Sequence, residues 1–338
     1  MSDLTVIVVT YNSAEHVAAC LGSCRGHNVI VVDNASGDNT VEIVQHYSQV
    51  RLIRNSQNRG FAAAVNQAVT ECDSSYVLLL NPDVVLLTPV DPLITACTAR
   101  TAAASGQLVD ASGHPQAGFT IRRFPTPATL MLETLGLNRL LPWNPINRAY
   151  RYKDRNLGMP GTVDQPAGAL LLFQRRVWEA LGGFDESFYP VWFEDVDFCR
   201  RIWRSGYSIV YAPDVKARHT GGASVGTLPP SCRELYWYVS LLRYASKHYG
   251  ALNFRLVSAA VALGSVLRAS VGLMRGRGFE PALTYAKVIQ VAGGCLLSGA
   301  ARLQRPVAGP VSIQAESASE EATPRAGNTT NRNELHVL

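Results

Sequence analysis

Two carboxylates in this sequence come at or just after the ends of apolar runs, in positions suited to holding a nucleotide and a cation. Asp33 follows Val29 to Val32, and its carboxylate can accept a hydrogen bond from the N3–H of a uracil or thymine ring. Asp83 follows Tyr76 to Leu80, so a rigid strand would deliver a hard oxygen ligand for Mg²⁺ or Mn²⁺. Together they predict a nucleotide and metal site.

Each carboxylate also has a plainer interpretation. Asp33 with Ser36 can cap the helix that follows, and Asn81-Pro82-Asp83 consists of common turn formers. For Asp83 we favour the turn and the ligand together. For Asp33 the two interpretations stay open.

Other polar residues at strand ends complete the expected nucleotide-sugar site. Thr10, Tyr11 and Asn12 can pack against the base, while Arg59 and Gly60 open a helix whose N-terminus a phosphate or sugar hydroxyl can approach. The expected nucleotide-sugar-binding residues are Thr10, Tyr11, Asn12, Asp33, Asn34, Arg59, Gly60, Asn81 and Asp83.

Three acids interrupt the aromatic stretch PVWFEDVDFCRRIWRSGY just before an amphipathic helix. Acids at a helix start interact favourably with its dipole, which is the structural interpretation of Glu194, Asp195 and Asp197. The functional interpretation is that Trp192 and Phe193 stack on a sugar face and lower the local polarity, which favours a carboxylate acting as base. Asp197 can instead cap the helix, and Arg200 or Arg201 can pair with an acid.

His219 lies in the sequence Arg-His-Thr-Gly-Gly, which predicts a flexible loop just beyond the last strand. A histidine there is either a metal ligand or a solvated loop residue. Taken alone, the motif favours the solvated residue.

The elements that must position these residues alternate along the first hundred residues. Apolar runs at Leu4 to Thr10, Val29 to Val32, Val50 to Arg54 and Tyr76 to Leu80 predict strands, and helical spacing follows each of the first three. Such alternation predicts an α/β fold with a mostly parallel sheet, helices on both faces and ligands at the carboxyl ends of the strands.

The middle of the chain is less regular. Between Thr101 and Gly161 the pattern weakens, so long loops or a flexible acceptor-side segment are expected. Beyond it, we predict a strand at Gly168 to Phe173, a helix at Arg175 to Leu181 and a last strand at Ser208 to Ala212.

The end of the chain predicts apolar helices and a disordered tail. Ser231 to Tyr249 is amphipathic, while Leu256 to Met274 and Val288 to Ala301 are apolar enough for a core, a membrane surface or a span. Arg268 would cost about 3 kcal/mol inside a bilayer, and Arg255, Arg275 and Arg277 fit anionic lipid, which favours a helix lying on the membrane. From about Pro306 onward the composition predicts disorder.

Composition excludes several classes of protein. With 338 residues, 47% hydrophobic and 17% charged, the chain is an ordinary folded protein, and a net charge of +5 indicates no nucleic acid. The seven cysteines show no disulfide framework, so we expect them reduced in the cytoplasm. Cys20 and Cys24 form at most half of a zinc site and are expected to be small buried side chains. The start Met-Ser-Asp predicts no signal peptide.

Seven stretches taken together resemble the family 2 glycosyltransferases, and within them a rhamnosyltransferase-like branch. They occur in family order over roughly residues 4 to 225: VIVVTYNS, VVDNASGDNT, NRGFAAAVNQA, LLLNPDV, PAGALLLFQRR, GGFDESFYPVWFEDVDFCRRIWRSGY and the His219 loop. Each fragment alone is weak. Their combination is specific.

The resemblance implies a GT-A fold and a role for each matching residue. Asp83 stands for the second acid of the family's Asp-X-Asp metal motif, and Asn81 replaces the first, so the donor diphosphate and His219 would share the Mg²⁺ or Mn²⁺ with Asp83. Asp195 would be the general base and Glu194 its support. Acceptor binding would involve Gly168, Ala169, Trp192 and Phe193.

The implied reaction is a single displacement with inversion, from a dTDP- or UDP-sugar such as dTDP-rhamnose to a glycan or polyprenyl-linked acceptor of the cell envelope, at the cytoplasmic membrane face. A nucleotidyltransferase is disfavoured because no glycine-rich, lysine-bearing phosphate loop is present, and a non-catalytic sugar-binding protein because the acids are retained. The expected organisation is a nucleotide-binding half (1–100), an acceptor half (101–225), C-terminal helices (226–304) and a tail (305–338). The sequence does not indicate an oligomeric state.

Overall fold

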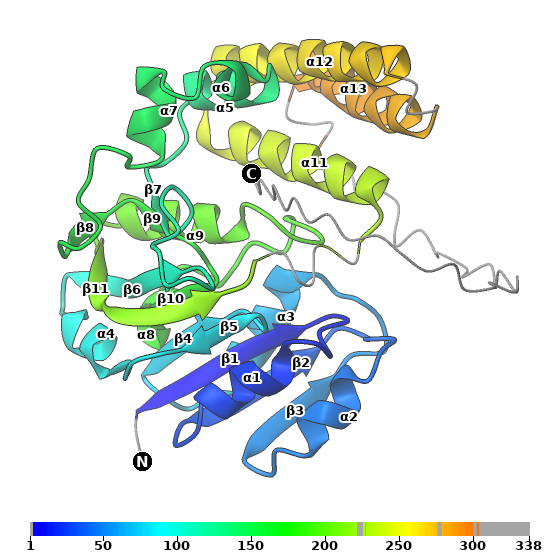
Figure 1. Ribbon diagram of the computed structural model, residues 1–338. Helices are drawn as coiled ribbons and strands as arrows, with labels where there is room; N and C mark the ends of the chain where they lie inside the picture. The colour runs from blue at the N-terminus through cyan, green and yellow to red at the C-terminus, as the bar shows by residue number, and fades with distance from the viewer. Residues whose placement is uncertain (1–2, 222–225, 227, 276–278, 300–302, 304–338) are drawn as a thin grey trace, which may run out of the picture.

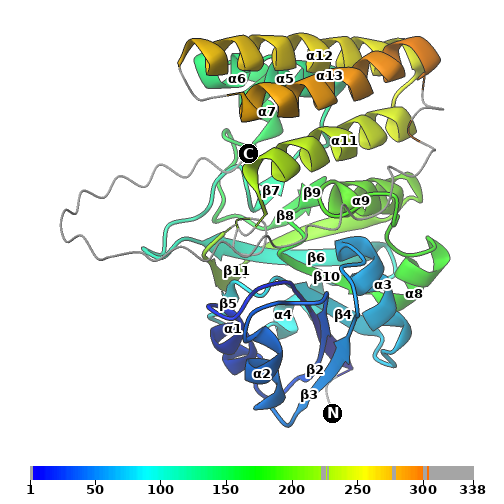
Figure 2. The ribbon, with the colours of Figure 1, turned by 90° about the vertical axis from the view of Figure 1, so that its right-hand side faces the viewer.

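The computed structural model describes residues 3–221, 226, 228–275, 279–299 and 303. Its centre is a nine-stranded mixed sheet in the order β3-β2-β1-β4-β10-β6-β11-β5, with β8 paired to β11. A cap of helices lies at the opposite end of the molecule from β3 and the N-terminus (Figures 1 and 2). The expected boundary at residue 225 and the tail 305–338 lie outside the described residues.

The first four strands form the parallel half of the sheet, as predicted. The alternating elements are β1 (Leu4–Thr10), α1 (Val17–Ser23), β2 (Asn28–Asp33), α2 (Thr40–Gln45), β3 (Val50–Arg54), α3 (Phe61–Thr70) and β4 (Tyr76–Leu80). β1 pairs in parallel with both β2 and β4, so the carboxyl ends of all three strands share one edge. This edge carries Thr10, Asp33 and the loop that leads to Asp83.

The segment expected to be loops contains a central strand and three helices. Its elements are β6 (Thr101–Val109), β7 (Ile121–Arg122), α5 (Pro127–Thr134), α6 (Leu137–Leu140) and α7 (Pro145–Tyr150). All nine residues of β6 are buried, and a Cβ on Gly106 would overlap the Val215 carbonyl oxygen. The expectation of loops was wrong here, because β6 is built from small residues that give little β-strand signal and suit tight packing.

The remaining elements complete the sheet and bring the acidic helix onto it. They are β5 (Val84–Leu86), α4 (Asp91–Ala96), β8 (Gly161–Val163), β9 (Gln165–Pro166), β10 (Leu170–Gln174), α8 (Arg175–Ala180), α9 (Glu194–Arg204) and β11 (Ser208–His219). β11 continues seven residues beyond the predicted end at Ala212. It alternates inward and outward residues along its length, and the last inward residue is His219.

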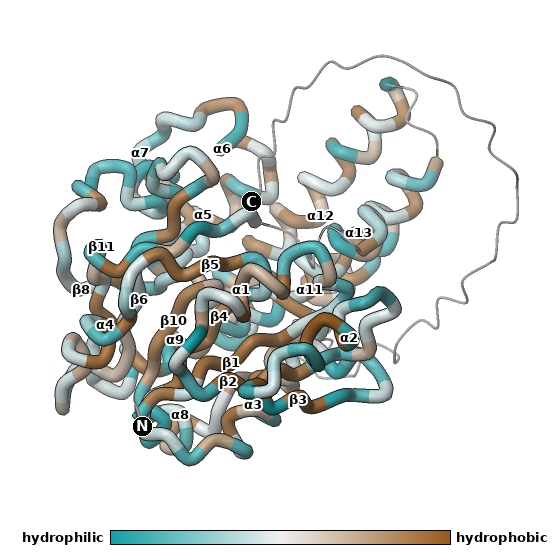
Figure 3. The backbone as a smooth tube through the Cα atoms, turned by 60° about the horizontal axis from the view of Figure 1, so that its bottom comes forward, coloured by the Kyte–Doolittle hydropathy of each residue, from teal (hydrophilic) through white to brown (hydrophobic). Residues whose placement is uncertain are grey.

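Two apolar cores lie on the two faces of the sheet, which confirms the predicted α/β fold. Residues of α3, α8 and α9 pack on one face. Residues of α1, α2 and α4 pack on the other, and this core includes Cys20 and Cys24, as expected of small buried side chains. Hydrophobic stretches follow β1, β2 and β4 through the centre of the molecule (Figure 3). All seven cysteines are free, and the described residues contain no cluster of three or more His, Cys, Asp or Glu that would complete a zinc site.

A third core joins the C-terminal helices to the rest of the chain. These helices are α11 (Pro230–His248), α12 (Ala251–Met274) and α13 (Glu280–Ser298). Their apolar residues pack with Leu130 of α5 and with Phe188 and Phe193. The predicted helical extension is therefore present, and it shares its core with the rest of the chain.

Arg268 contributes to the packing of α12 against α5. Its guanidinium donates hydrogen bonds to the carbonyl oxygens of Glu133 and Thr134 at the end of α5 and to that of Gly264. Gly264 allows the close approach, because a Cβ there would overlap the Thr134 carbonyl oxygen. The charge that counted against a membrane span thus satisfies the last carbonyl groups of a neighbouring helix.

Candidate active site

The carboxylate of Asp33 lies at the carboxyl end of β2. It is 2% exposed and accepts hydrogen bonds from Thr10 Oγ1 (2.9 Å), from the Ser36 backbone N–H (2.9 Å) and from the Ser36 hydroxyl. Helix α2 begins only at Thr40, after the N-cap residue Asn39. Asp33 therefore does not cap that helix, and its contact with the base stays a prediction.

The two loops beside Asp33 are held together by asparagine side chains. Asn12, at φ +49°, accepts a hydrogen bond from the Gly37 N–H (2.8 Å) and donates its own N–H to Ser36 Oγ (2.9 Å). Asn34 is buried, donates to the Gly60 carbonyl oxygen (3.2 Å) and accepts from Asn55 (2.9 Å). We assign Asn34 to shaping the loops, since its side chain is engaged with protein groups.

The start of α3 is covered by the segment before α9. At Gly60, with φ +84°, a Cβ would lie 2.9 Å from the Tyr189 ring, and the Phe61 N–H donates to the Pro190 carbonyl oxygen (2.8 Å). Arg59 is exposed beside this contact. The close approach that Gly60 permits is therefore that of Tyr189 and Pro190, while donor binding by Arg59 stays a prediction.

Asp83 and His219 come together although 136 positions separate them. β5 and β11 are antiparallel with Val84 opposite His219, which places Asp83 Oδ2 3.6 Å from His219 Nε2. Both side chains are 4% exposed, and the Gly221 N–H donates to Asp83 Oδ2 (3.0 Å). The expectation of a solvated loop was wrong, because His219 is the last, inward-facing residue of a longer β11.

Gln116 sets the tautomer of His219. Its amide nitrogen donates to the His219 carbonyl oxygen (2.9 Å), which directs its amide oxygen at His219 Nδ1 (2.9 Å). An amide oxygen only accepts, so Nδ1 carries the hydrogen and Nε2 presents its lone pair toward Asp83. Burial lowers the pKa of His219, with the Asp83 charge opposing, and this favours the neutral ring.

Phe119 fixes the plane of the same imidazole. The two rings stack with centroids 4.9 Å apart and an interplanar angle of 12°. Gln116 and Phe119 both lie in the segment for which the sequence predicted loops. No motif marks them, so only their contacts with His219 reveal the role.

Asp195 is held at the first turn of α9 by two backbone N–H groups. Gly168 N–H donates to Oδ2 (2.9 Å) and Val196 N–H to Oδ1 (2.8 Å). A Cβ on residue 168 would lie 3.1 Å from the Asp195 Cβ, so the glycine permits this approach. Burial raises the pKa of Asp195, while these hydrogen bonds and the charge of Arg122 oppose the rise.

Glu194 lies beside Asp195 and is buried. Burial, and then the Asp195 charge, raise its pKa well above the usual value. Its Oε2 has no hydrogen-bond partner within the described part of the chain. A buried carboxyl oxygen without a protein partner suits a ligand hydroxyl.

The third acid, Asp197, is structural. It is completely buried and accepts hydrogen bonds from Arg201 Nε (2.8 Å), His248 Nε2 (2.8 Å) and Lys247 Nζ (3.0 Å). These partners lower its pKa to about 2 in spite of burial. Of the interpretations offered by the sequence, pairing with Arg201 is confirmed, and His248 and Lys247 of α11 add a tie between two helices.

The two aromatic residues before α9 differ in availability. The Phe193 ring is 8% exposed and its centroid lies 5.4 Å from that of the Tyr244 ring in the third core, while its stacking on a sugar stays a prediction. Trp192 is partly exposed, and its acceptor role stays a prediction. Both residues have positive φ, +81° and +70°, a conformation that costs on the order of 1–3 kcal/mol and is concentrated at functional sites.

Backbone contacts link the two halves of the site. Gly168 bonds to Asp195, and the next residue, Ala169, accepts a hydrogen bond from the Asn81 N–H (3.1 Å), two residues before Asp83. Asp195 and the Asp83–His219 pair are therefore connected through these backbone contacts at the strand ends. Asn81, the first position of the metal motif, takes part through its backbone.

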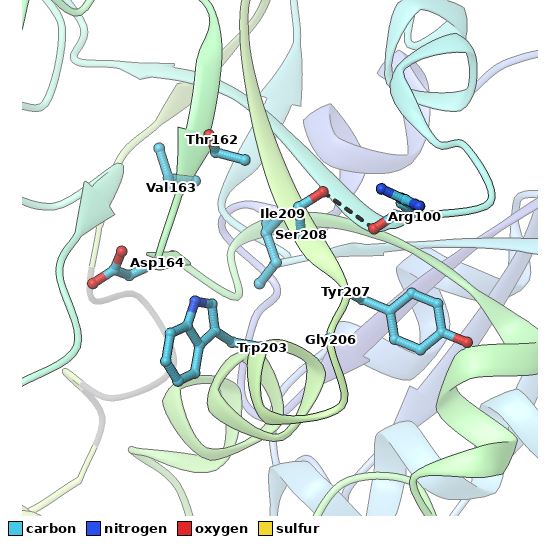
Figure 4. A pocket seen from close by; sticks show the side chains of 9 residues that line it. All are labelled: Arg100, Thr162, Val163, Asp164, Trp203, Gly206, Tyr207, Ser208 and Ile209. Atoms are coloured by element: carbon cyan, nitrogen blue, oxygen red, sulfur yellow. Dashed lines mark hydrogen bonds between the residues drawn. The ribbon is translucent and has the colours of Figure 1, made fainter.

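A separate hollow of about 450 Å³ lies away from these residues, between β8, the end of α9 and the start of β11 (Figure 4). Its lining contains none of the predicted site residues. Asp164 is its only acid, and Asp164 accepts hydrogen bonds from the Phe124 N–H (2.9 Å) and the Tyr152 hydroxyl (3.3 Å). We assign this hollow no part in the chemistry.

Comparisons with known proteins agree with this geometry. Residues 5–170 match the model for glycosyl transferase family 2. An N-acetylglucosaminyl-diphospho-decaprenol L-rhamnosyltransferase from Mycobacterium tuberculosis is 29% identical over 81% of this chain and 95% of the relative. The rhamnosyltransferase WbbL from Escherichia coli is 24% identical over 63% of this chain and 82% of the relative.

A solved mannosyltransferase, PcManGT from Pyrobaculum calidifontis, covers 87% of each chain at 18% identity with a TM-score of 0.49, which is too weak to bear on donor or metal. The fold, the site and the matches together define the protein as a glycosyltransferase. Its residues 5–170 match glycosyl transferase family 2, and the relatives it is similar to are rhamnosyltransferases. The matched range ends before Asp195 and His219, so the roles of those two rest on their motifs and geometry.

Proposed function

We propose that this glycosyltransferase moves a deoxyhexose such as rhamnose, with inversion, from a dTDP- or UDP-sugar to a hydroxyl of a lipid-linked or polysaccharide acceptor in cell-envelope glycan synthesis. The observation that carries the proposal is the continuous site formed by Asp195, Gly168 and the Asp83–His219 pair. The relatives' names support the sugar and the acceptor.

Asp195 is the general base of the proposed reaction. Its carboxylate takes the proton of the acceptor hydroxyl as that oxygen attacks the anomeric carbon, and the bond to the donor diphosphate breaks. The backbone donors Gly168 and Val196 fix the carboxylate, and the raised pKa brings it nearer the value at which a base is most effective. Glu194 receives the acceptor through its unpartnered oxygen.

The residues present fit a divalent cation. The neutral His219 ring directs a lone pair at a carboxylate 3.6 Å away, an arrangement that a cation between the two groups would stabilise. The Gln116 contact to Nδ1 is the outer hydrogen bond expected of a ligating histidine. Mg²⁺ or Mn²⁺ bound there supplies charge stabilisation for the departing diphosphate.

Removal of the metal is expected to stop transfer. EDTA should abolish activity, and Mn²⁺ or Mg²⁺ should restore it. His219→Ala should need more metal for half-maximal activity, since one protein ligand is lost, while His114→Ala, an exposed histidine of the same segment as Gln116, should behave like the native protein. Full turnover in chelator would contradict the metal role.

The donor can be identified by thermal shift. With Mn²⁺ present, a panel of nucleotide sugars is added to the full chain, and the true donor should raise the unfolding temperature most, because a ligand that binds only the native state stabilises it. We expect dTDP-rhamnose and then UDP-sugars to give the largest shifts. Configuration at C1 of the product, measured by NMR, tests inversion, and a set of donors without any shift would remove the proposal.

We also propose that the C-terminal helices lie on the inner face of the cytoplasmic membrane as a peripheral anchor. Among the described residues, α12 has the length and the mean hydropathy, 1.8, to cross a bilayer, and 33% of that apolar window is buried in the protein. Its opposite side exposes leucines, including Leu263 at 55% and Leu267 at 49%. An exposed apolar stripe beside a packed one suits a helix lying at an interface.

Charging the exposed stripe should release the protein from lipid. Leu263→Glu with Leu267→Glu is expected to lower co-sedimentation with phosphatidylcholine–phosphatidylglycerol vesicles at least about 10-fold, since each buried leucine is worth about 1.5–3 kcal/mol. Leu87→Glu, an equally exposed leucine (50%) after β5, is the matched control and should sediment normally. Unchanged sedimentation of the double variant, with native helix content, would exclude this surface as the anchor.

A further inference from the structure

Two arginines lie together between Asp195 and the apolar helices. Arg122 Nε donates to the Gly118 carbonyl oxygen (2.8 Å), and the side-chain stem of Arg151 packs against the same glycine, where a Cβ would lie 3.0 Å from the Arg151 Cβ. Gly118 has φ +77°, so both its conformation and this contact favour glycine. These contacts with Gly118 bring the guanidinium groups of Arg122 and Arg151 close to each other.

Protein acids only partly balance these charges. Within the described residues the terminal nitrogens of Arg122 make no hydrogen bond or ion pair. Arg151 donates to Asn147 Oδ1 (3.0 Å), and its nearest acid, Glu133, is 3.8 Å away. Burial and then the Arg122 charge lower the pKa of Arg151, as expected of two neighbouring cations. An anionic ligand would relieve this repulsion.

Arg122 and Arg151 lie between the apolar C-terminal helices and Asp195, the proposed base. Arg122 in β7 pairs with Gln165 in β9, three residues before Gly168, which bonds to Asp195. On the other side, Arg151 follows α7, and α5 bonds to α12 through Arg268. β7 and β9 lie between the central sheet and the cap formed by α5, α7 and α12 (Figures 1 and 2).

We propose that Arg122 and Arg151 bind a phosphate or diphosphate group of the acceptor, which joins the sugar presented to Asp195 to a lipid that lies along the apolar helices. This inference rests on the proposed function and names the acceptor class as phosphate-linked. The donor diphosphate has the same chemistry, but its expected place is the Asp83–His219 pair.

Farnesyl diphosphate in EDTA is the probe, because without metal a diphosphate has little reason to occupy the donor site. Binding to the full chain is measured by calorimetry, with farnesol as the same tail without phosphate. Arg122→Gln should weaken farnesyl diphosphate binding at least about 10-fold, the scale of one lost charge-assisted contact, and leave farnesol binding unchanged. Arg122→Lys should bind between the native and glutamine variants.

Arg123→Gln is the matched control, because Arg123 is exposed and its guanidinium lies over the Tyr152 ring (5.2 Å). It should bind as the native chain does. Binding of dTDP with Mn²⁺ should not change in Arg122→Gln, and unfolding temperatures confirm that each variant is folded. Arg151→Gln is measured in the same way, together with Arg151→Lys, which keeps the charge.

Three results with farnesyl diphosphate and farnesol would overturn the inference. They are native-like farnesyl diphosphate binding by Arg122→Gln, an equal loss in Arg123→Gln, or farnesol binding as tightly as the diphosphate. An equal loss of dTDP binding in Arg122→Gln would assign the pair to the donor instead and also overturn it. Failure of the native chain to bind any nucleotide with Mn²⁺ would remove the proposed function. The farnesyl diphosphate result does not depend on nucleotide binding, so the two failures can be told apart.

Discussion

Replacement of Asp195 by asparagine is expected to lower the rate of sugar transfer at least about 10²-fold, the lower scale of general-base contributions. An amide cannot take the acceptor proton, yet it has the size of the carboxylate held by Gly168 and Val196. The measurement is kcat with saturating donor and acceptor. Calorimetry of dTDP with Mn²⁺ should give native affinity, because the proposed nucleotide contacts are those of Asp33 and Asp83.

The pH profile and a control separate chemistry from folding. Because burial raises the pKa of Asp195, native kcat/KM should fall as the pH drops through that raised value, since only the deprotonated carboxylate accepts a proton. Asp214→Asn removes an exposed carboxylate of β11 and should leave the rate unchanged. Near-normal turnover of Asp195→Asn in a clean preparation would remove Asp195 from the role.

The second large effect concerns stability. Asp197→Asn is expected to lower the free energy of unfolding by about 3 kcal/mol, the lower end for breaking a buried ion pair, because Arg201 and Lys247 keep partial access to water. His248 loses its charged partner in the same step. Urea unfolding followed by circular dichroism measures the change.

The same carboxylate predicts acid sensitivity. Its folded pKa is about 2, below the usual 3.8, so the unfolded chain takes up the proton first as the pH falls. The stabilisation is complete above about pH 4 and is lost toward pH 2. Asp197→Asn should lack this component of the acid transition. Asp185→Asn removes the partly exposed partner of Lys247 and should cost at most about 1 kcal/mol; an equal cost for both variants would contradict the buried network.

Local patterns were enough to predict the parallel half of the sheet. β1, β2, β3 and β4 are short apolar runs, and each is flanked by a helix with its own periodicity. Polar residues after such strands must gather at one edge, because parallel neighbours end on the same side. For this reason the hydrogen bond between Thr10 and Asp33 could be expected from the order of the strands along the chain.

Local patterns failed where small or mixed residues form buried structure. β6 reads TAAASGQLV, with β-branched residues only at its two ends and no aromatic residue, and only its place between β10 and β11 makes it a strand. Gln116, Phe119 and Arg122 follow β6, so their roles were hidden with it. A polar side chain beside a distant histidine leaves no periodic signal in the sequence.

By itself the sequence determined the α/β class, the acids at the strand ends and the start of α9, and the apolar C-terminal helices. Only the tertiary structure decided which of these residues meet: His219 with Asp83 and Gln116, Asp195 with Gly168, and Asp197 with His248. The physical reason is the distance along the chain over which each kind of interaction acts. Periodicity and capping act within a few residues, whereas these contacts join positions 27 to 136 apart, and they form only when the register of β11 on β5 and the packing of α11 on α9 are set.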